Sequence, residues 1–311
     1  MTVSNARRIR PAEAVVLAVA LALTVLAWVR CAPRGAGAPA AGAAAPTVRV
    51  AAVQMHSRFA EPEANRARME TLARQAARRG AKIIVFPEAA VQGYVSPEFE
   101  LWTDPARRPG EGRSLAGFAE PADGESARRF GRLAAELKCY LVVPFIERDE
   151  AAGRYYNSLL LFGPAGERLL HYRKLNPWPR GEATWAADGD LGLAHVDTEF
   201  GRLGLLICYD VHTVAAKLAA EKVDTLLYAI AWVDSKPEVW FGERLPEKAR
   251  SLGVNIVAAN WTFPEAHRLT DRGYGYSRVI DRTGRVLAAA SGECAEEVVI
   301  ADLPVPAKPK P

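Results

Sequence analysis

The chain has 311 residues, of which 50% are hydrophobic and 24% charged, so it can bury a large core and is not a disordered protein. Its formal charge of +4 arises from arginines that are scattered among acidic residues or crowded near the N-terminus. No basic stripe is interleaved with aromatic side chains, which excludes nucleic acid as a partner.

The first 46 residues differ in composition from the rest. Arg7, Arg8 and Arg10 precede an uninterrupted apolar run at residues 14–29, and a stretch rich in Ala, Gly and Pro follows. This layout is typical of a signal peptide. The run is slightly shorter than the roughly 20 residues that span a bilayer, so cleavage after Ala43-Ala44-Ala45 and retention as a membrane anchor both stay open. Either outcome exports the domain, to the periplasm or extracellular space or to the outer side of the cytoplasmic membrane.

The cysteines give weaker indications than the N-terminal segment does. The four cysteines lack the density of a disulfide scaffold and the paired spacing of a zinc site. A bridge between Cys139 and Cys294 stays open, because separation in sequence says nothing of separation in space. Lipid attachment at Cys31 is a further alternative, disfavoured because Arg30 stands where such sites prefer a small residue.

From Thr47 onward, apolar strand patterns alternate with amphipathic helix patterns. The strand patterns lie at residues 48–53, 82–86, 140–145, 156–162, 168–172, 203–207, 225–230, 255–259, 277–281 and 286–290. The helix patterns lie at residues 64–79, 126–137 and 246–252, and turn sequences at 163–166 and 282–284 predict hairpins. This alternation predicts one α/β domain over residues 47–303, with helices on the sheet faces and a Pro and Lys rich tail at residues 304–311.

Three reactive side chains each follow an apolar run. Glu88, Lys174 and Cys208 stand at or just past the ends of predicted strands, where open α/β sheets gather their sites. A lone cysteine in such a place is more often a small buried hydrophobe. Together, however, the three supply the nucleophile, the proton acceptor and the positive charge that attack on a carbonyl requires. The combination predicts a catalytic site.

These segments resemble the nitrilase, or carbon-nitrogen hydrolase, superfamily, whose members carry a Glu-Lys-Cys triad. The matching motifs are Phe86-Pro87-Glu88, Tyr172-Arg173-Lys174 and Cys208-Tyr209-Asp210, in the family's order and spacing. The resemblance implies a four-layer αββα sandwich over residues 47–303, no metal or cofactor, and a homodimer or higher homo-oligomer. A second glutamate often precedes the Tyr-Asn pair of this family, and Glu147 is the residue predicted to position Lys174 or the substrate.

The resemblance also implies a mechanism. A free thiol has a pKa near ~8.5, so we expect Lys174 to favour the thiolate of Cys208 while Glu88 takes the proton. The oxyanion is expected to lie between Lys174 and the Tyr209 backbone N–H, and water then opens the thioester. A cysteine–histidine pair with His212, four residues after Cys208, is an alternative; we expect His212 instead to face the substrate pocket or cap the turn.

Aromatic residues near the reactive segments predict a pocket for an apolar or planar acyl group, although core filling accounts for them equally well. They are Tyr94, Trp178, Tyr209, Trp232 and Trp261. The segments that carry the last two are similar to the biotinidase and pantetheinase branch, which favours a small-molecule amide substrate over a nitrile or an N-carbamoyl compound.

Two other classes stay open on the same motifs. An N-acyltransferase is disfavoured because that resemblance implies several membrane spans, whereas this chain offers one candidate. A catalytically silent binding protein would normally have lost one reactive group, whereas Glu88, Lys174 and Cys208 are all present.

Overall fold

The computed structural model describes residues 46–94, 115–179, 181–232, 234, 236–263 and 274–306. One set of strands comprises β1 (Thr47–Gln54), β2 (Ile83–Val85), β3 (Tyr140–Asp149), β4 (Arg154–Phe162), β5 (Arg168–Arg173) and β12 (Glu297–Pro304). A second set comprises β6 (His195–Thr198), β7 (Gly201–Ile207), β8 (Thr225–Ile230), β9 (Asn255–Asn260), β10 (Arg278–Ile280) and β11 (Val286–Ala289). The α-helices are α2 (Pro62–Arg78), α4 (Glu125–Leu137), α5 (Val214–Ala220), α6 (Pro237–Val239) and α7 (Leu245–Leu252). Short helical turns are η2 (Leu115–Gly117), η3 (Glu182–Thr184), η4 (Cys208–His212) and η5 (Trp240–Arg244).

Each set of strands forms a six-stranded sheet, and the two sheets share one design. Their orders are β12-β1-β2-β3-β4-β5 and β11-β10-β9-β8-β7-β6. Three parallel neighbours, β1-β2-β3 in one sheet and β7-β8-β9 in the other, are flanked by antiparallel strands. The carboxyl ends of the parallel strands in each sheet therefore meet at a single edge.

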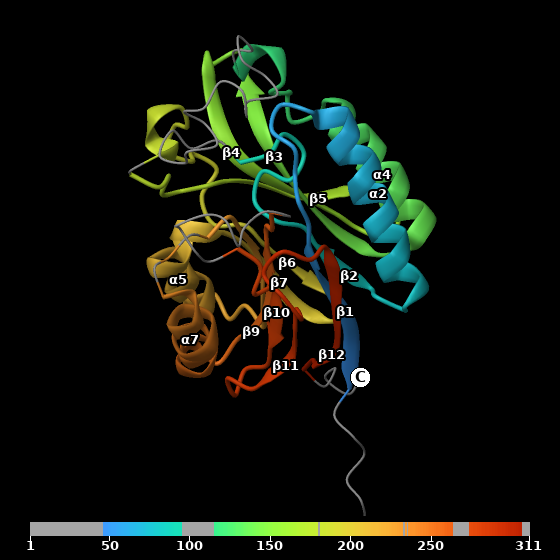
Figure 1. Ribbon diagram of the computed structural model, residues 1–311, viewed down its shortest axis with the longest axis vertical. Coiled ribbons are helices and arrows are strands. Elements are labelled where there is room, and N and C mark those ends of the chain that lie inside the picture. Colours follow the sequence, from blue (N-terminus) through green and yellow to red (C-terminus); the bar gives the residue numbers. More distant parts are fainter. Residues whose placement is uncertain are drawn as a thin grey trace, which may run out of the picture. The chain divides into compact units, whose positions relative to one another are not determined.

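Helices cover the outer faces of both sheets. Figure 1 shows α2 and α4 side by side against the first sheet, and α5 and α7 against the second. The inner faces meet where β1 and β2 contact β8 and β9. Side chains alternate along β1: Val50 and Ala52 join the core between the sheets, whereas Ala51 and Val53 join the core under α2 and α4. The predicted four-layer αββα sandwich is confirmed.

The strand β3 is longer than its sequence pattern predicts. Residues 146–149 pair with β4 although three of them are charged. The carboxylates of Glu147 and Asp149 are both held by the guanidinium of Arg173, which compensates their charge. The strands β6 and β12 and the helix α5 were not predicted. Pairing of β12 with β1 over its whole length also carries the ordered domain to Pro304, one residue beyond the predicted boundary.

The predicted signal or anchor at residues 14–29 lies outside the described residues, and none of the helices that are described is long and apolar enough to cross a membrane. Cys139 and Cys294 are both free thiols, so the bridge left open by the sequence is not formed. Cys139 is buried under α2 and α4, whereas Cys294 packs against a separate cluster around Trp261.

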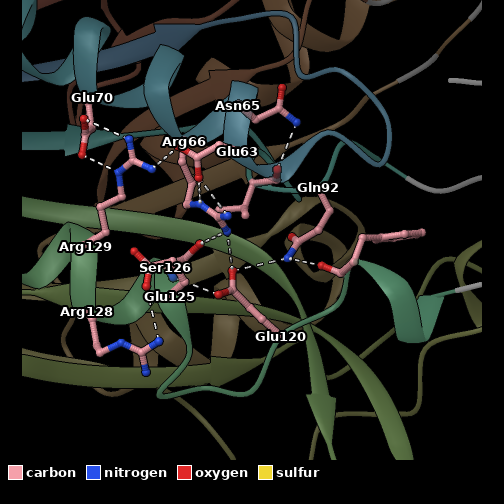
Figure 2. Close-up of polar contacts among 12 residues, drawn as sticks. Glu63, Asn65, Arg66, Glu70, Gln92, Glu120, Glu125, Ser126, Arg128 and Arg129 are labelled. Carbon is pink, nitrogen blue, oxygen red and sulfur yellow. Dashed lines mark hydrogen bonds and ion pairs between the residues drawn. The ribbon is translucent and has the colours of Figure 1, made fainter. Parts of the chain in front are cut away.

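The turn that follows β2 is held from outside by a polar side chain of α2 (Figure 2). Asn65 donates from Nδ2 to the carbonyl oxygens of Arg58 and Val91 at 2.6 and 3.0 Å, and its Oδ1 accepts from the Arg58 N–H at 2.8 Å. Because Glu88 stands at the start of this turn, Asn65 helps to fix the backbone that carries that carboxylate.

A second buried amide in the same turn reaches the neighbouring strand. Gln92 accepts the Ile146 N–H at 2.8 Å and donates to the Phe118 carbonyl at 3.3 Å, and Figure 2 shows it beside Glu120. The nearby ion pairs of Arg129 with Glu63 and Glu70 lie closer to the surface between α2 and α4. Exposed pairs of this kind contribute little to stability, so the buried amides are the main polar anchors of the turn.

We expect Asn65→Ala to lower the free energy of unfolding by about 2 kcal/mol, because a buried carbonyl of Val91 and part-buried backbone groups of Arg58 lose their partner. The matched control is Arg128→Ala, which breaks an exposed ion pair with Glu125 and is expected to cost less than about 0.5 kcal/mol. Urea titrations followed by circular dichroism measure both changes. Equal losses would show that Asn65 is not an anchor.

Candidate active site

The predicted reactive residues converge at the edge where the parallel strands end. Glu88 follows β2, Lys174 follows β5 and Cys208 follows β7. The strand β5 runs in the same sense as β2, since it is antiparallel to β4, which is in turn antiparallel to β3. The Glu88 N–H donates to the carbonyl of Ile230 at the end of β8, at 3.2 Å, which links the two sheets at this edge. All three reactive side chains are buried.

An ammonium group between two carboxylates forms the centre of the site. Lys174 Nζ donates to Glu88 Oε1 at 2.7 Å and to Glu182 Oε2. Glu182 lies on η3 and is fully buried, and its Oε2 also accepts the Trp178 N–H at 2.9 Å. Sequence reasoning missed Glu182, because it lies in a segment without strand or helix periodicity. The sole cue in the sequence was its position eight residues after Lys174.

Glu147, the residue predicted to position Lys174 or the substrate, bonds other residues than Lys174, so the first of these two roles is not the one that its contacts support. Its Oε1 accepts from Arg173 Nη2 at 2.5 Å, and its Oε2 contacts His171 at 2.7 Å and Ser158 Oγ at 2.6 Å. Successive side chains of a strand point to opposite faces. Arg173 and His171 therefore point away from the face that carries Lys174, and Glu147 lies with them. Glu182 makes the contact expected of Glu147.

The two oxygens of Glu88 have different surroundings. Oε1 accepts from both Lys174 Nζ and Asn157 Nδ2, each at 2.7 Å, whereas Oε2 is buried and has no hydrogen-bond partner. Burial and the charge of Glu182 raise the pKa of Glu88 to about 7, against the opposing charge of Lys174. A carboxylate with such a pKa and one open oxygen is suited to accept and return a proton near neutral pH.

The pKa of the thiol is shifted in the direction opposite to our expectation. Burial and the negative charge of Glu88 raise the pKa of Cys208 well above its usual value, and they outweigh Lys174 and the Ala231 N–H. Lys174 does favour the thiolate, as expected, but burial and Glu88 have the larger effect, so the pKa of the thiol lies above its usual value. Burial lowers the pKa of Lys174, but Glu182 and Glu88 raise it by more, so this side chain remains an ammonium.

Cys208 is the first residue of η4 and directly follows β7. Its φ of +33° falls in the left-handed region that residues with a side chain rarely adopt. Tyr228 of the neighbouring strand donates its O–H to the Cys208 carbonyl at 3.0 Å. Strained conformations of this kind persist where surrounding contacts fix them, and they are frequent at active sites. The turn presents the sulfur at the strand edge.

Asp210 joins the cysteine turn to the lysine segment. Its Oδ2 accepts the Tyr172 O–H at 2.6 Å, and its Oδ1 accepts the backbone N–H and the Nδ2 of Asn176 at 2.9 and 2.8 Å. These partners flank Lys174 on both sides in sequence. The spacing between Lys174 and Cys208 is thus set by a buried carboxylate two residues after the nucleophile.

The predicted aromatic residues divide into two groups. Trp232 stacks on Trp240 with ring centroids 4.2 Å apart, and the exposed His212 packs against Trp232 and Tyr209 at 6.0 and 5.2 Å. Partial desolvation of its ring and the charge of Lys248 lower the pKa of His212. The ring contacts of His212 are with aromatic side chains, whereas the charges that shift the pKa of Cys208 most are those of Glu88 and Lys174, so the site favours Glu88 over His212 as the partner of the thiol.

The second group is closer to the core-filling alternative. Tyr94 is buried and makes an edge contact with Trp261 at 5.5 Å, within a cluster that also includes Ala231. Trp178 is half-buried and contacts the site through its backbone N–H to Glu182. Tyr209 directly follows Cys208 in the chain, and Trp232 directly follows Ala231, whose backbone N–H bonds the Cys208 sulfur. These two are therefore the predicted pocket residues that stand next in sequence to the groups at the sulfur.

A buried thiol, carboxylate and ammonium at the strand ends of an αββα sandwich define a class of site that can attack a carbonyl or nitrile carbon. The sequence matches the carbon-nitrogen hydrolase family over residues 49–307, and the chain belongs to this family. It is a hydrolase that acts on carbon-nitrogen bonds other than peptide bonds.

Known proteins agree with this assignment. The chain is similar to a bifunctional nitrilase/nitrile hydratase from Lupinus angustifolius, with 29% identity over 83% of this chain and 78% of the relative. It is also similar to an omega-amidase from Mus musculus, with 27% identity over 83% and 88%. Among solved structures, an amidase from Nesterenkonia of the nitrilase superfamily has a TM-score of 0.66 at 22% identity, covering 83% and 90%. A nitrilase-superfamily protein of Saccharomyces cerevisiae has a TM-score of 0.68 at 23% identity, with the same coverage. The likeness to the biotinidase and pantetheinase branch stays a prediction.

Glu88→Gln should make Cys208 react faster with iodoacetamide. The substitution removes a negative charge that raises the pKa of the thiol and leaves Lys174 and the Ala231 N–H, which lower it. Because the thiolate is the reacting form, alkylation at about pH 8 should accelerate by roughly tenfold for each unit by which the pKa falls. Mass spectrometry of the Cys208 peptide measures the rate, with Asp197→Asn at an exposed ion pair as the control. An unchanged or slower rate would contradict the assigned electrostatics.

Proposed function

We propose that the protein hydrolyses a non-peptide amide of a small molecule through a Cys208 thioester, giving a carboxylic acid and an amine or ammonia. One observation carries this proposal: a buried Glu88 oxygen without a hydrogen-bond partner, on a carboxylate that binds Lys174 and acts electrostatically on Cys208. In the described site, both oxygens of Glu182 and the Oε1 of Glu88 accept hydrogen bonds. Among the carboxylate oxygens of these two residues, Glu88 Oε2 alone has no such bond.

In the first step the thiol proton moves to Glu88 Oε2 as the sulfur attacks the carbonyl carbon. Proton transfer accompanies attack, since burial and Glu88 raise the pKa of Cys208 and so disfavour a free thiolate. An ammonium has three N–H donors, and Glu88 and Glu182 take two of those of Lys174. The third donor and the Tyr209 backbone N–H hold the developing oxyanion. Loss of one such donor typically costs about 3 kcal/mol of transition-state stabilisation.

In the second step Glu88 returns its proton to the leaving amine, and the carbon–nitrogen bond breaks to leave the thioester. The same carboxylate then activates water, which adds to the thioester and releases the acid and the Cys208 thiol. Glu182 holds the ammonium of Lys174 in place throughout, the part that sequence reasoning gave to Glu147. Its second oxygen accepts from Asn157, so Glu182 itself is fixed at both ends.

An amide is favoured over a nitrile because the similar proteins include an omega-amidase and an amidase. The similarity to a nitrilase/nitrile hydratase supports a nitrile as the second candidate. The aromatic side chains of Tyr209, His212 and Trp232 favour an apolar or planar acyl group. We also propose that the subunits assemble into a homodimer or a higher homo-oligomer.

The test is release of ammonia or amine across primary amides, N-substituted amides, N-carbamoyl compounds and nitriles. We expect turnover with an amide, and loss of at least about 10³-fold in kcat for Cys208→Ala, which lacks the nucleophile. Cys139→Ala is the matched control, since that thiol is buried in the core under α2 and α4. Trapping of an acylated Cys208 by mass spectrometry supports the thioester. No turnover on any of these compounds would overturn the proposed function.

Residues 1–46 are proposed to direct the hydrolase out of the cytoplasm, either as a cleaved signal peptide or as an anchor. The basic residues before the apolar run at residues 14–29 support this role. We expect a fusion of residues 1–46 to alkaline phosphatase, which is active only after export, to show activity in a bacterial host. The same fusion without residues 14–29 is the control, and equal activities would reject export. Intact mass of the recovered fusion distinguishes cleavage from retention.

A further inference from the structure

The inner face of β4 carries one polar residue in an otherwise apolar row. Asn157 stands two residues before Leu159 and four before Leu161, and strand alternation places the three on the same face. All are buried, and both leucines belong to the core between the sheets. A leucine at position 157 would continue the row. Packing alone therefore does not account for the amide.

The hydrogen bonds of Asn157 fix how its amide is oriented. Nδ2 donates to Glu88 Oε1 at 2.7 Å and to Glu182 Oε1 at 2.5 Å, whereas Oδ1 is buried without a partner. The reverse orientation would place the amide oxygen against two carboxylate oxygens, which can only accept. The side chain thus gives both N–H groups to the carboxylates and leaves its own oxygen unpaired, a costly arrangement for a residue that serves only packing.

Asn157 also contacts the third member of the centre. Its backbone carbonyl accepts the Lys174 N–H at 2.8 Å, so one residue holds both the lysine backbone and the glutamate carboxylate. The charged or titratable groups that act on Glu88 are Lys174 after β5, Glu182 on η3 and Cys208 on η4. Asn157 is the uncharged donor among them, and it stabilises the ionised form of Glu88.

We propose that Asn157 is a positioning residue for proton transfer: together with Lys174 it holds Glu88 by Oε1, so that Oε2 alone remains to take the thiol proton. The inference rests on the proposed function, because it assigns that transfer to Glu88. Asn157 acts through Glu88 and Glu182 and needs no contact with the substrate.

The test is the pH dependence of Asn157→Leu. In the wild type the acid limb of kcat/KM reports ionisation of Glu88, whose pKa is about 7. Loss of a hydrogen bond to the charged form raises that pKa, so the limb should move to higher pH by about one unit. The plateau kcat should fall more than KM changes. Asn157→Ala removes the same donors without added volume and gives the same test should leucine disturb the core.

The matched control is Asn255→Ala at the opposite end of the parallel strands. Asn255 is also a buried amide, and it bonds the Pro304 carbonyl and the Arg282 N–H, each at 2.9 Å. We expect it to lower the midpoint of thermal unfolding without moving the acid limb. An acid limb of Asn157→Leu that coincides with that of the wild type overturns the inference and leaves the residue a structural role.

A second readout separates this inference from the proposed function. The carboxyl band that infrared difference spectroscopy assigns to Glu88, by its loss in Glu88→Gln, can be titrated without substrate. We expect its midpoint to rise by about one pH unit in Asn157→Leu. If the wild type turned over no amide or nitrile, the proposed function would fail while this titration still decided whether Asn157 controls Glu88. An unshifted band refutes the role of Asn157.

Discussion

The site depends on one buried ammonium group held between two carboxylates. Lys174, Glu88 and Glu182 are all buried, and isolated charges in such a place would carry a large desolvation cost. Pairing offsets that cost only with good geometry and further hydrogen bonds, which Asn157 and the Trp178 N–H supply. With two anions and one cation, the centre carries an excess negative charge. Burial and the charge of Glu182 raise the pKa of Glu88 to about 7, and burial and the charge of Glu88 raise the pKa of Cys208.

The remaining contacts around the centre are made by side chains of different helices and strands, and they hold the members of the centre in place. Asp210 connects the cysteine turn to both sides of Lys174, Tyr228 fixes the strained carbonyl of Cys208, and Asn65 anchors the turn after Glu88. Each contact joins an element of one sheet or helix to a neighbour far away in sequence. A site of this kind stays in place because several rigid strands converge on it, which is the arrangement that precise catalytic geometry requires.

The sequence predicted most of the sandwich, since apolar runs and helical periodicity are local signals. The prediction failed where polar residues continue a strand, as in β3, and where an edge strand has weak alternation, as in β6. Prediction of the site followed the same division. Glu88, Lys174 and Cys208 each end an apolar run and were found, whereas Glu182 lies on a short turn in a segment without periodicity and was missed. Glu147 was chosen by its place beside a motif, but strand alternation turns it toward Arg173.

By itself, the sequence determined the family and the kind of fold, and it picked out Glu88, Lys174 and Cys208 as the reactive side chains that meet, because motif residues and strand ends are properties of consecutive positions. Only the tertiary structure decided which second glutamate meets the lysine, which oxygen of Glu88 is open, and in which direction the pKa of the thiol is shifted. These properties depend on distance and burial among groups that are far apart along the chain. Charge interactions and desolvation act through space, and no local pattern records them.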